Sequence, residues 1–253
     1  MPTISRSYGW VPDIPDQRDH LYTAPPVVLE ALPDRTDIRA MCPDIYDQGQ
    51  LGSCTANAIA GAFACGQRLQ QLTEFTPSRL FIYYNERAME GTIRTDAGAS
   101  LRDGVKTVAS QGVCPETLWP YDVTQFAVRP AASVYRAARD HKALSYQRVQ
   151  QSLSQLKGCL AHGYPFVFGF AVYESFESPA VASTGVVSMP RGRECMLGGH
   201  AVMAVGYDDA SQRFIVRNSW GASWGDEGYC TMPYAYLASA SLSADFWALL
   251  QVS

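Results

Sequence analysis

The sequence predicts an α+β fold with two lobes, a helical lobe from the first half of the chain and an antiparallel, barrel-like β lobe from the second half. Stretches with helical spacing of apolar residues concentrate before about residue 162. Short aromatic and β-branched runs, separated by glycine and aspartate, follow as far as about residue 236. Helices and strands that segregate along a chain form separate layers, and ligands tend to bind in the groove between them.

The first 31 residues are expected to form an extended arm, because prolines at positions 12, 15, 25 and 26 disfavour a regular helix. The aromatic residues Tyr8, Trp10 and Tyr22 leave two interpretations of this arm open. They either pin it to the surface as a strand or coil, or they place it across a functional cleft.

Five helices and four strands are predicted after the arm. The helices are expected from Cys54 to about Leu72, Pro77 to about Met89, Ser100 to Ser110, Ala131 to Lys142 and near Ser152 to His162. The strands are expected in YPFVFGFAVY, HAVMAVGYD, RFIVRNSW and GYCTMPYAY. This order predicts an arm at 1–31, one domain at 32–245 with a helical lobe at about 37–145 and a β lobe at about 146–245, and a C-terminal tail at 246–253.

Composition excludes several classes of protein. Hydrophobic residues at 47% and charged residues at 17% are typical of a globular chain, and a net charge of −4 gives no basic footprint for nucleic acid or for an anionic membrane. No apolar run reaches the roughly 18 residues of a membrane-spanning helix. The start, MPTISRSYGWVPD, lacks the apolar core and cleavage site of a secretory signal. A cytoplasmic and a secreted location both stay open.

The cysteines predict neither a metal site nor a disulfide scaffold. There are seven of them, at positions 42, 54, 65, 114, 159, 195 and 230, and none form a CxxC pair. An odd number is compatible with three disulfides and one working thiol, or with seven reduced thiols. We therefore expect no metal and no cofactor, and we leave the pairing of Cys42, Cys65, Cys114, Cys159, Cys195 and Cys230 open.

The stretch YDQGQLGSCTANA places a thiol where a glycine turn becomes a helix. Unpaired N–H groups and the positive end of the helix dipole lower the pKa of a thiol at that place, which predicts that Cys54 is a nucleophile in its thiolate form. Gly49 and Gly52 permit the tight turn and leave room for a substrate backbone. The alternative interpretation is that Cys54 is a small buried residue of the core. A core cysteine needs no histidine or asparagine nearby, whereas a nucleophile does.

One histidine is placed to act with such a thiol. His200 opens an apolar strand directly after two glycines, whereas His20 lies in the arm and His141 and His162 are expected at polar helix ends. Asn218 in VRNSWGASWGDEGY is a candidate to fix the orientation of the His200 ring, with aromatic cover from the tryptophans beside it.

These blocks resemble the papain family of cysteine peptidases. The family has a glutamine six residues before the cysteine of a GSC helix start, a histidine opening a strand, and an asparagine in NSWG; here they are Gln48, Cys54, His200 and Asn218. LPDRTDIR, DAGASLRDGVKTVASQGVCPETLWPY and NSWGASWGDEGY extend the collinear resemblance from Leu32 to about residue 236. The proline- and aspartate-rich arm is most similar to that of bacterial members.

Two residues depart from the family pattern. Leu51 replaces the cysteine usual three residues before the nucleophile, and Thr55 replaces the tryptophan that usually follows it. The disulfide made from the first position is therefore impossible, and we expect packing to hold the nucleophile loop in its place.

The resemblance implies a papain-like fold, with a helical left lobe, a barrel-like right lobe and the active site in the cleft between them. It implies a monomeric cysteine endopeptidase acting on peptides or proteins, in which Cys54 and His200 form a thiolate–imidazolium pair and a thioester intermediate. Asn218 would hold the histidine, and the Gln48 side chain with the Cys54 N–H would form the oxyanion hole. By the same resemblance the substrate-binding residues are Gly98, Ala99, Ser100, Gly199, Ala201 and Trp220.

Two further expectations and two alternatives follow. Small residues beside His200 would leave an apolar pocket for the side chain two positions before the cut, and residues 1–31 would inhibit the enzyme from within the same chain. The alternatives are a thiol acyltransferase or transglutaminase-type enzyme, with an amine as acceptor, and a non-catalytic peptide-binding module on the same fold. Product analysis with an added amine separates the first alternative from a peptidase.

Overall fold

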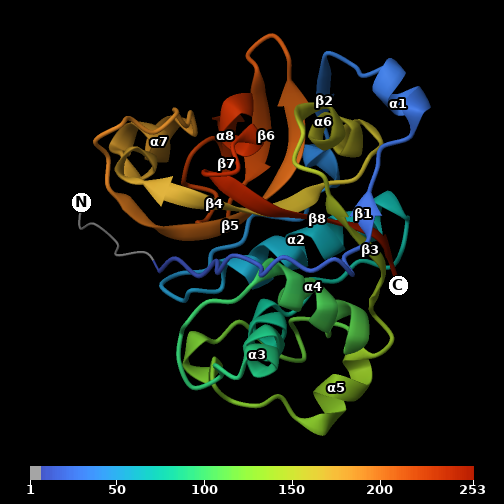
Figure 1. The fold of residues 1–253 in the computed structure, drawn as a ribbon. Coiled ribbons are helices and arrows are strands. Elements are labelled where there is room, and N and C mark those ends of the chain that lie inside the picture. The colour runs from blue at the N-terminus through green and yellow to red at the C-terminus, as the bar shows by residue number, and fades with distance from the viewer. Residues whose placement is uncertain (1–6) are drawn as a thin grey trace.

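The computed structural model describes residues 7–253 and has the two lobes that the sequence predicts (Figure 1). In that view α3, α4 and α5 form the lower lobe, the sheet forms the upper lobe, and α2 lies between them. The helices are α1 (Pro26–Glu30), α2 (Cys54–Leu69), α3 (Arg79–Glu90), α4 (Leu101–Ser110), α5 (Ala132–Ala138), α6 (Leu153–Ala161), α7 (Pro179–Thr184) and α8 (Tyr234–Ala238). All five predicted helices are thereby confirmed, although α5 is shorter than expected.

The end of α5 shows why that helix was predicted too long. It stops at Ala138, and the carbonyl of His141 accepts a hydrogen bond from Val113 N at 2.8 Å. From Ala143 the chain is a strand, β3, which the sequence did not predict. This strand crosses the boundary expected between the lobes at 145/146.

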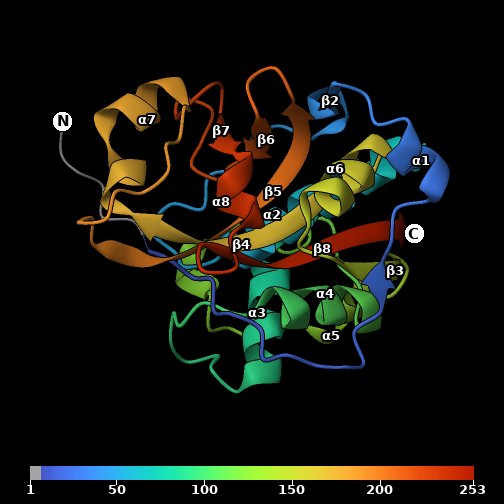
Figure 2. The ribbon, with the colours of Figure 1, turned by 45° about the horizontal axis from the view of Figure 1, so that its top comes forward.

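One mixed sheet forms the β lobe. Its strands are β1 (Leu21–Tyr22), β2 (Arg35–Asp37), β3 (Ala143–Val149), β4 (Phe166–Tyr173), β5 (Met196–Asp208), β6 (Arg213–Arg217), β7 (Tyr229–Pro233) and β8 (Ser243–Val252). Their order is β1-β3-β8-β4-β5-β6-β7, with β2 paired to β5, so the sheet is barrel-like but open. β1 and β3 are parallel and the other pairs are antiparallel. α6 lies along one face of this sheet (Figure 2).

The C-terminal tail expected at 246–253 is wrong, because residues 246–252 belong to the interior strand β8. β8 pairs with β3 on one side and with β4 on the other. Phe246, Trp247 and Ala248 are at most 2% exposed. A strand covered on both faces has a continuous apolar run instead of an alternating pattern, and this run was not recognised as a strand.

The arm is less extended than the prolines suggested. α1 forms in spite of Pro26, because proline at the first position of a helix loses no intrahelical hydrogen bond. Leu21 and Tyr22 pair with β3, which attaches this end of the arm to the β lobe. Residues 7–20 take a different course, between the two lobes (Figures 1 and 2).

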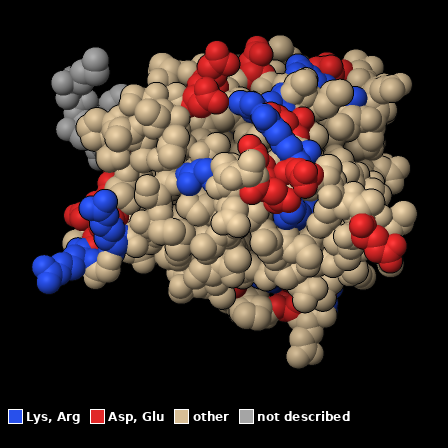
Figure 3. Space-filling model, turned by 90° about the horizontal axis from the view of Figure 1, so that it is seen from above, with Lys and Arg blue, Asp and Glu red and all other residues tan. Residues whose placement is uncertain are grey.

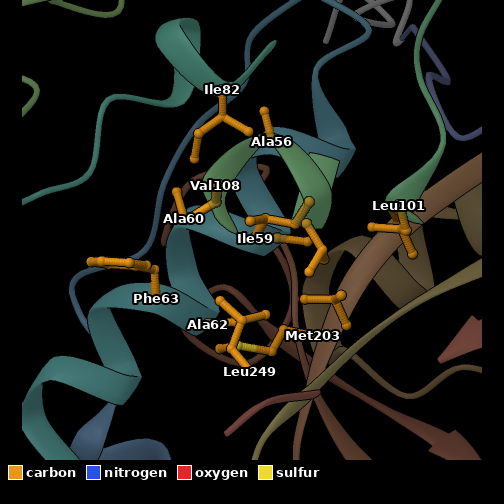
Figure 4. Packing of buried hydrophobic residues seen from close by; sticks show 14 of the residues in the cluster. Ala56, Ile59, Ala60, Ala62, Phe63, Ile82, Leu101, Val108, Met203 and Leu249 are labelled. Carbon is orange, nitrogen blue, oxygen red and sulfur yellow. The ribbon is translucent and has the colours of Figure 1, made fainter. Parts of the chain in front are cut away.

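The core between the lobes is built around α2. Its small side chains, among them Ala56, Ala60 and Ala62, let the helix lie close to Met203 of β5 and Leu249 of β8 (Figure 4). A β-carbon at Gly61 would stand only 3.3 Å from the side chain of Arg217. The glycine that lowers helix propensity here therefore has a packing reason.

All seven cysteines are reduced in the structure. Cys42 and Cys65 have their Sγ atoms 4.0 Å apart, at hydrogen-bonding and not at bonding distance. None of the helices formed by residues 7–253 combines the length and apolar character needed to cross a membrane.

Candidate active site

The predicted nucleophile is the first residue of α2 and is completely buried. Cys54 follows Ser53, the N-cap residue, and has an exposed fraction of 0%. The turn before it contains Gly49 at φ +61°, a conformation that favours glycine. Cys54 therefore stands at a helix N-terminus, as the sequence predicts.

Packing holds the nucleophile loop as expected, because Leu51 is 6% exposed and belongs to the core, and a carboxylate holds it as well. The Gly52 N–H lies 3.0 Å from each carboxylate oxygen of Asp96. Tyr83 also donates a hydrogen bond to Asp96, and Gly98 N donates to the Tyr83 hydroxyl at 3.2 Å. Next to Leu51, where relatives would have a cysteine, a hydrogen-bonded network thus joins the nucleophile loop to the loop around Gly98.

A second carboxyl group lies one residue beyond the nucleophile. Thr55 Oγ1 donates to Glu86 Oε1 at 2.6 Å, and Glu86 is completely buried. Burial raises the pKa of this carboxyl group well above its usual range. Gly104 leaves the space for it, since a β-carbon there would stand 2.6 Å from Glu86 Oε2. Threonine after the cysteine therefore has a specific hydrogen-bond partner.

Across the cleft, the histidine and the asparagine meet. His200 Nε2 lies 2.8 Å from Asn218 Oδ1, which also accepts a hydrogen bond from Ser219 N at 2.8 Å. The Trp220 ring stacks on the imidazole with a centroid distance of 4.9 Å. His200 lies inside β5, four residues after the strand begins, and not at its start as predicted.

The predicted oxyanion residue is fixed by the opposite lobe. Gln48 N donates to Ser219 O at 2.9 Å, and Ser219 Oγ donates to Gln48 Oε1 at 2.6 Å. The Nε2 amide of Gln48 donates to Leu51 O at 3.1 Å and to Ser7 O at 3.4 Å. Ser219 was missed in the sequence, although it stands inside the NSWG block next to Asn218.

The arm runs through the cleft and pairs with both of its walls. Val11 N donates to Ala99 O at 3.0 Å, and Ala99 N donates to Gly9 O at 2.8 Å, which is a parallel bridge. Trp10 N donates to Gly199 O at 3.0 Å on the other side. Gly9 fits so closely that a β-carbon on it would stand 1.7 Å from the Gly52 carbonyl oxygen.

Of the predicted substrate-binding residues, Gly98 faces the arm and Ser100 does not. A β-carbon on Gly98, which has φ +73°, would collide with the Gly9 carbonyl, so this residue faces the arm. Ser100 instead caps α4, accepting from Asp103 N at 3.3 Å, and its own N–H donates to Glu90 at 2.7 Å. Its polar groups are therefore occupied within the fold.

The ring of Trp10 fills a slot in the β lobe. β-carbons on Gly169 and Gly199 would stand 1.9 Å and 2.7 Å from this ring. The indole Nε1 donates to Asp245 Oδ2 at 3.2 Å, and Asp13 N donates to the same oxygen at 2.8 Å. The pocket beside His200 was expected to be apolar; the slot next to it contains a carboxylate.

A buried charge cluster fastens the next part of the arm. Asp13 accepts from Trp247 Nε1 at 2.9 Å, and Asp19 pairs with Arg102 and Arg148 at 2.5 Å and 3.2 Å. Arg148 also pairs with Asp245 at 3.0 Å. Burial raises the pKa of Asp13, and burial together with the nearby Asp13 raises the pKa of Asp245 to about 6.

The protonation state of Cys54 under the arm differs from the one that the sequence predicts. Burial raises the pKa of Cys54 to about 12, while hydrogen bonds with the backbone of Ala201, Gly9 and Thr55 act in the opposite direction. With the arm in the cleft, desolvation outweighs the effect of the helix end, and the neutral thiol is favoured. The thiolate predicted from the sequence does not belong to this closed arrangement.

Comparisons with known proteins agree with this geometry. The sequence pattern of the papain family cysteine proteases matches residues 32–243. The chain belongs to the papain family. Its fold resembles the crystal structure of xylellain, a cysteine protease from Xylella fastidiosa, with a TM-score of 0.91 and 42% identity over 98% of this chain and 97% of that one.

Two further relatives show how widely the similarity extends. An uncharacterized peptidase C1-like protein of Acanthamoeba polyphaga mimivirus is 42% identical over 99% of this chain and 89% of its own length. The cathepsin B-like CP2 of Giardia intestinalis is 27% identical over 81% of this chain and 69% of its own length. The chain is a papain-family cysteine endopeptidase, and the expected similarity to the bacterial enzyme is confirmed.

Proposed function

We propose that Cys54 is the nucleophile and His200 the acid and base of peptide-bond hydrolysis. The thiolate attacks the scissile carbonyl, and His200 gives its proton to the leaving amine. The resulting thioester is hydrolysed by water, which His200 activates. Asn218 orients the imidazole, and Trp220 shields that hydrogen bond from water. The 2.8 Å contact between His200 Nε2 and Asn218 Oδ1 carries this assignment, because it fixes the orientation of the imidazole ring in the cleft.

The oxyanion hole is assigned to Gln48 and to the N–H of Cys54. Gln48 is held at both its backbone and its side-chain oxygen by Ser219, which leaves the Nε2 group to donate. In the closed arrangement that group donates to the Ser7 carbonyl of the arm. A backbone carbonyl of the chain itself therefore occupies one of the donors that a substrate carbonyl needs.

The substrate is assigned an extended backbone between Ala99 and Gly199. Both residues use their main-chain groups to bind the arm, in the way an added strand binds a sheet edge. A peptide substrate and the arm cannot occupy these groups together. We therefore propose that the arm is an inhibitor within the same chain, and that the enzyme acts as a monomer because one chain supplies every assigned group.

The slot filled by Trp10 suggests which side chain the uncovered enzyme accepts. Both hydrogen bonds to Asp245 Oδ2 come from the arm, from Trp10 and from Asp13 N. Once the arm has left, this buried oxygen lacks its donors. We propose that a substrate side chain carrying a donor, arginine or lysine first, is preferred there over a purely apolar one.

The experiment that tests the function is covalent labelling with an irreversible peptide vinyl sulfone. A specific protease site is inserted between residues 14 and 18, where Ile14 is 81% exposed, so that the arm can be cut after folding. Cut protein is expected to be labelled at Cys54 and to hydrolyse peptides, and Cys54→Ala to do neither. Uncut protein is expected to react much more slowly.

Other results identify the alternatives. No labelling of the folded, cut protein would favour a peptide-binding module. Amide products formed with an added amine in place of acids would favour an acyltransferase. Equal labelling before and after the cut would retain the catalytic assignment and reject the inhibitory arm. Adding Trp10→Ala to the cut protein controls for an arm that stays bound after cleavage.

A further inference from the structure

A large hollow lies on the helical lobe, away from the cleft. It has a volume of about 1040 Å³ and is bordered by α3, the end of α4 and α5. Four cationic residues line it: Arg129, Arg136, Arg139 and Lys142. In Figure 1, α3 and α5 lie at the bottom of the molecule, farthest from the sheet. We call this hollow the basic groove.

Seven of the 16 arginines that the structure describes pair with an aspartate or glutamate, and the three arginines of the basic groove are among the nine that do not. Arg39, Arg68, Arg79, Arg102 and Arg148, for example, each pair with an aspartate or glutamate. Figure 3 shows the β-lobe end, where blue and red side chains lie beside one another. Within residues 7–253, no carboxylate lies at ion-pair distance from Arg129, Arg136 or Arg139.

No acidic residue is among the described residues that line the groove. The whole chain carries a net charge of −4, so this gathering of positive charge is local and runs against the average. Like charges close together repel, and an anionic ligand removes that repulsion. The groove is thus matched to negative charge.

The walls of the groove are held in place by hydrogen bonds. Lys142 Nζ donates to Ser110 O at 2.9 Å, and the Tyr135 hydroxyl donates to Asn85 Oδ1 at 2.8 Å. Tyr84 is 6% exposed and forms part of the floor. The tyrosine rings offer apolar contact between the cations, and the arginine side chains around them are exposed.

The size and chemistry of the groove favour an acidic polypeptide segment. Arginine guanidinium groups bind carboxylates in a forked geometry, with two hydrogen bonds each. The cations are spread over residues 129–142, so a single small anion would meet only some of them, whereas successive Asp and Glu side chains can meet all. The mixed phenol and aliphatic walls suit the backbone and the methylene groups of such a segment.

The groove is connected to the catalytic centre through α3. Arg79, the first residue of α3, donates from Nη1 to Asp47 O, next to Gln48, at 3.1 Å. Tyr84, Asn85 and Ala88 line the groove about two turns farther along, roughly 8–14 Å at 1.5 Å per residue. One unfolded protein chain can therefore reach both places.

We propose that the basic groove is an exosite that binds an acidic segment of protein substrates while another segment of the same substrate occupies the cleft. This inference rests on the peptidase function. It predicts that acidic protein substrates are cleaved at lower concentration than neutral ones with the same cleavable sequence, and that salt removes the difference.

The test uses one cleavable peptide joined through a flexible linker to a tail of ten alternating Glu and Gly residues, or of ten alternating Ser and Gly residues. Tails are placed at either end of the peptide, and the enzyme has its arm cut. The acidic tail is expected to lower KM at least fivefold at low salt, with kcat unchanged, and the effect is expected to vanish near 0.5 M salt.

The variants separate the exosite from the active site. Arg136→Glu with Arg139→Glu is expected to remove the effect of the acidic tail and to leave hydrolysis of the peptide without a tail unchanged. Arg35→Glu, on β2 of the other lobe, makes the same change of charge as Arg136→Glu alone and is expected to keep the tail effect. If no peptide is cleaved at all, the peptidase function fails, and the exosite fails with it.

Three results would overturn the proposal while leaving the peptidase intact. The first is equal KM for acidic and neutral tails. The second is an equal loss of the tail effect in Arg35→Glu and Arg136→Glu. The third comes from a binding assay with a fluorescent acidic peptide and the Cys54→Ala protein. A single-stranded oligonucleotide and the unlabelled acidic peptide are compared as competitors. If the oligonucleotide displaces the fluorescent peptide at much lower concentration, the groove is assigned to nucleic acid instead.

Discussion

On the helical side of the cleft, hydrogen bonds to two carboxyl groups, the exposed Asp96 and the buried Glu86, hold the residues around Cys54, whereas on the β side the His200 ring lies among aromatic side chains. Asp96 accepts from Gly52 N, and Glu86 accepts from Thr55. The imidazole, in contrast, stacks on Trp220 and has the ring of Phe170 at a centroid distance of 5.7 Å.

The difference follows from what each side has to fix. The nucleophile side must hold a backbone turn, whose N–H groups need directional partners. The histidine side must hold a planar ring that can still exchange protons, and stacked rings restrict its tilt without occupying its nitrogens. Substitutions on the two sides should therefore have different effects. On the β side they should lower the free energy of unfolding, because packing is lost. On the helical side they should mainly lower activity, because the positions of the reacting groups change.

The largest effect is expected on the β side, from Trp220→Ala. Trp220 is 3% exposed and contacts Phe176 and Trp224 as well as His200. Removing such a side chain typically costs about 3–5 kcal/mol of unfolding free energy. Urea denaturation measures the loss, and Trp220→Phe, which keeps a ring over the imidazole, is expected to recover most of it. A cost below about 1 kcal/mol for the alanine variant would contradict the packing role.

On the helical side, Gln48→Ala is expected to lower turnover far more than it weakens substrate binding. One lost oxyanion donor typically costs about 2.7–4 kcal/mol of transition-state stabilisation, or on the order of 10²- to 10³-fold in kcat. KM should change little, because the donor acts mainly on the developing negative charge. Steady-state kinetics of the arm-cut enzyme check this, and unchanged turnover would remove Gln48 from the oxyanion hole.

The sequence allowed much of this to be predicted, for a physical reason. The residues to which we assign the chemistry have local sequence signals: a thiol at a glycine turn, a histidine after two glycines and an asparagine two residues before a tryptophan. Helices with strong periodicity, such as α2, could be placed for the same reason. β8 could not, because a strand buried on both faces has no alternation by which to recognise it.

What the sequence left open were the contacts between distant segments. Asp96 lies 44 residues from Gly52 and Glu86 lies 31 from Thr55, and neither spacing is visible in a local pattern. The course of the arm depends in the same way on Asp245, near the far end of the chain. Leu51 and Thr55 were the available signals, since each departs from the family and so requires a different partner.

A smaller effect is expected from Asp96→Ala, which removes the acceptor that holds Gly52. Leaving that N–H without its partner should cost about 1–3 kcal/mol of stability and lower kcat/KM of the arm-cut enzyme roughly tenfold. Asp96→Asn keeps one acceptor oxygen of the same size and is expected to retain most of the activity. If both variants behave like the parent enzyme, packing alone is enough to hold the loop.

The smallest effect is expected from pH, through the strength of arm binding. This prediction compares the cleft with the arm bound and the cleft with the arm released. Burial and the nearby Asp13 carboxyl raise the pKa of Asp245 to about 6 while the arm is bound. A carboxyl group whose pKa is higher in the bound arrangement takes up a proton on binding, so falling pH strengthens the arm and rising pH through about 6 weakens it.

The measurement for this dependence is the activity ratio of uncut to cut enzyme between pH 5 and 7, in which the titration of the catalytic pair cancels. The ratio is expected to rise about five- to tenfold between pH 5 and 7. A shift of one pKa unit corresponds to about 1.4 kcal/mol, which is a factor of about ten in the equilibrium constant for arm binding. Asp245→Asn removes the titrating group next to Arg148 and should flatten most of the change. A ratio that instead rises towards acid pH would mean that the pairs of Asp19 with Arg102 and Arg148 control release, and not the Asp13–Asp245 contact.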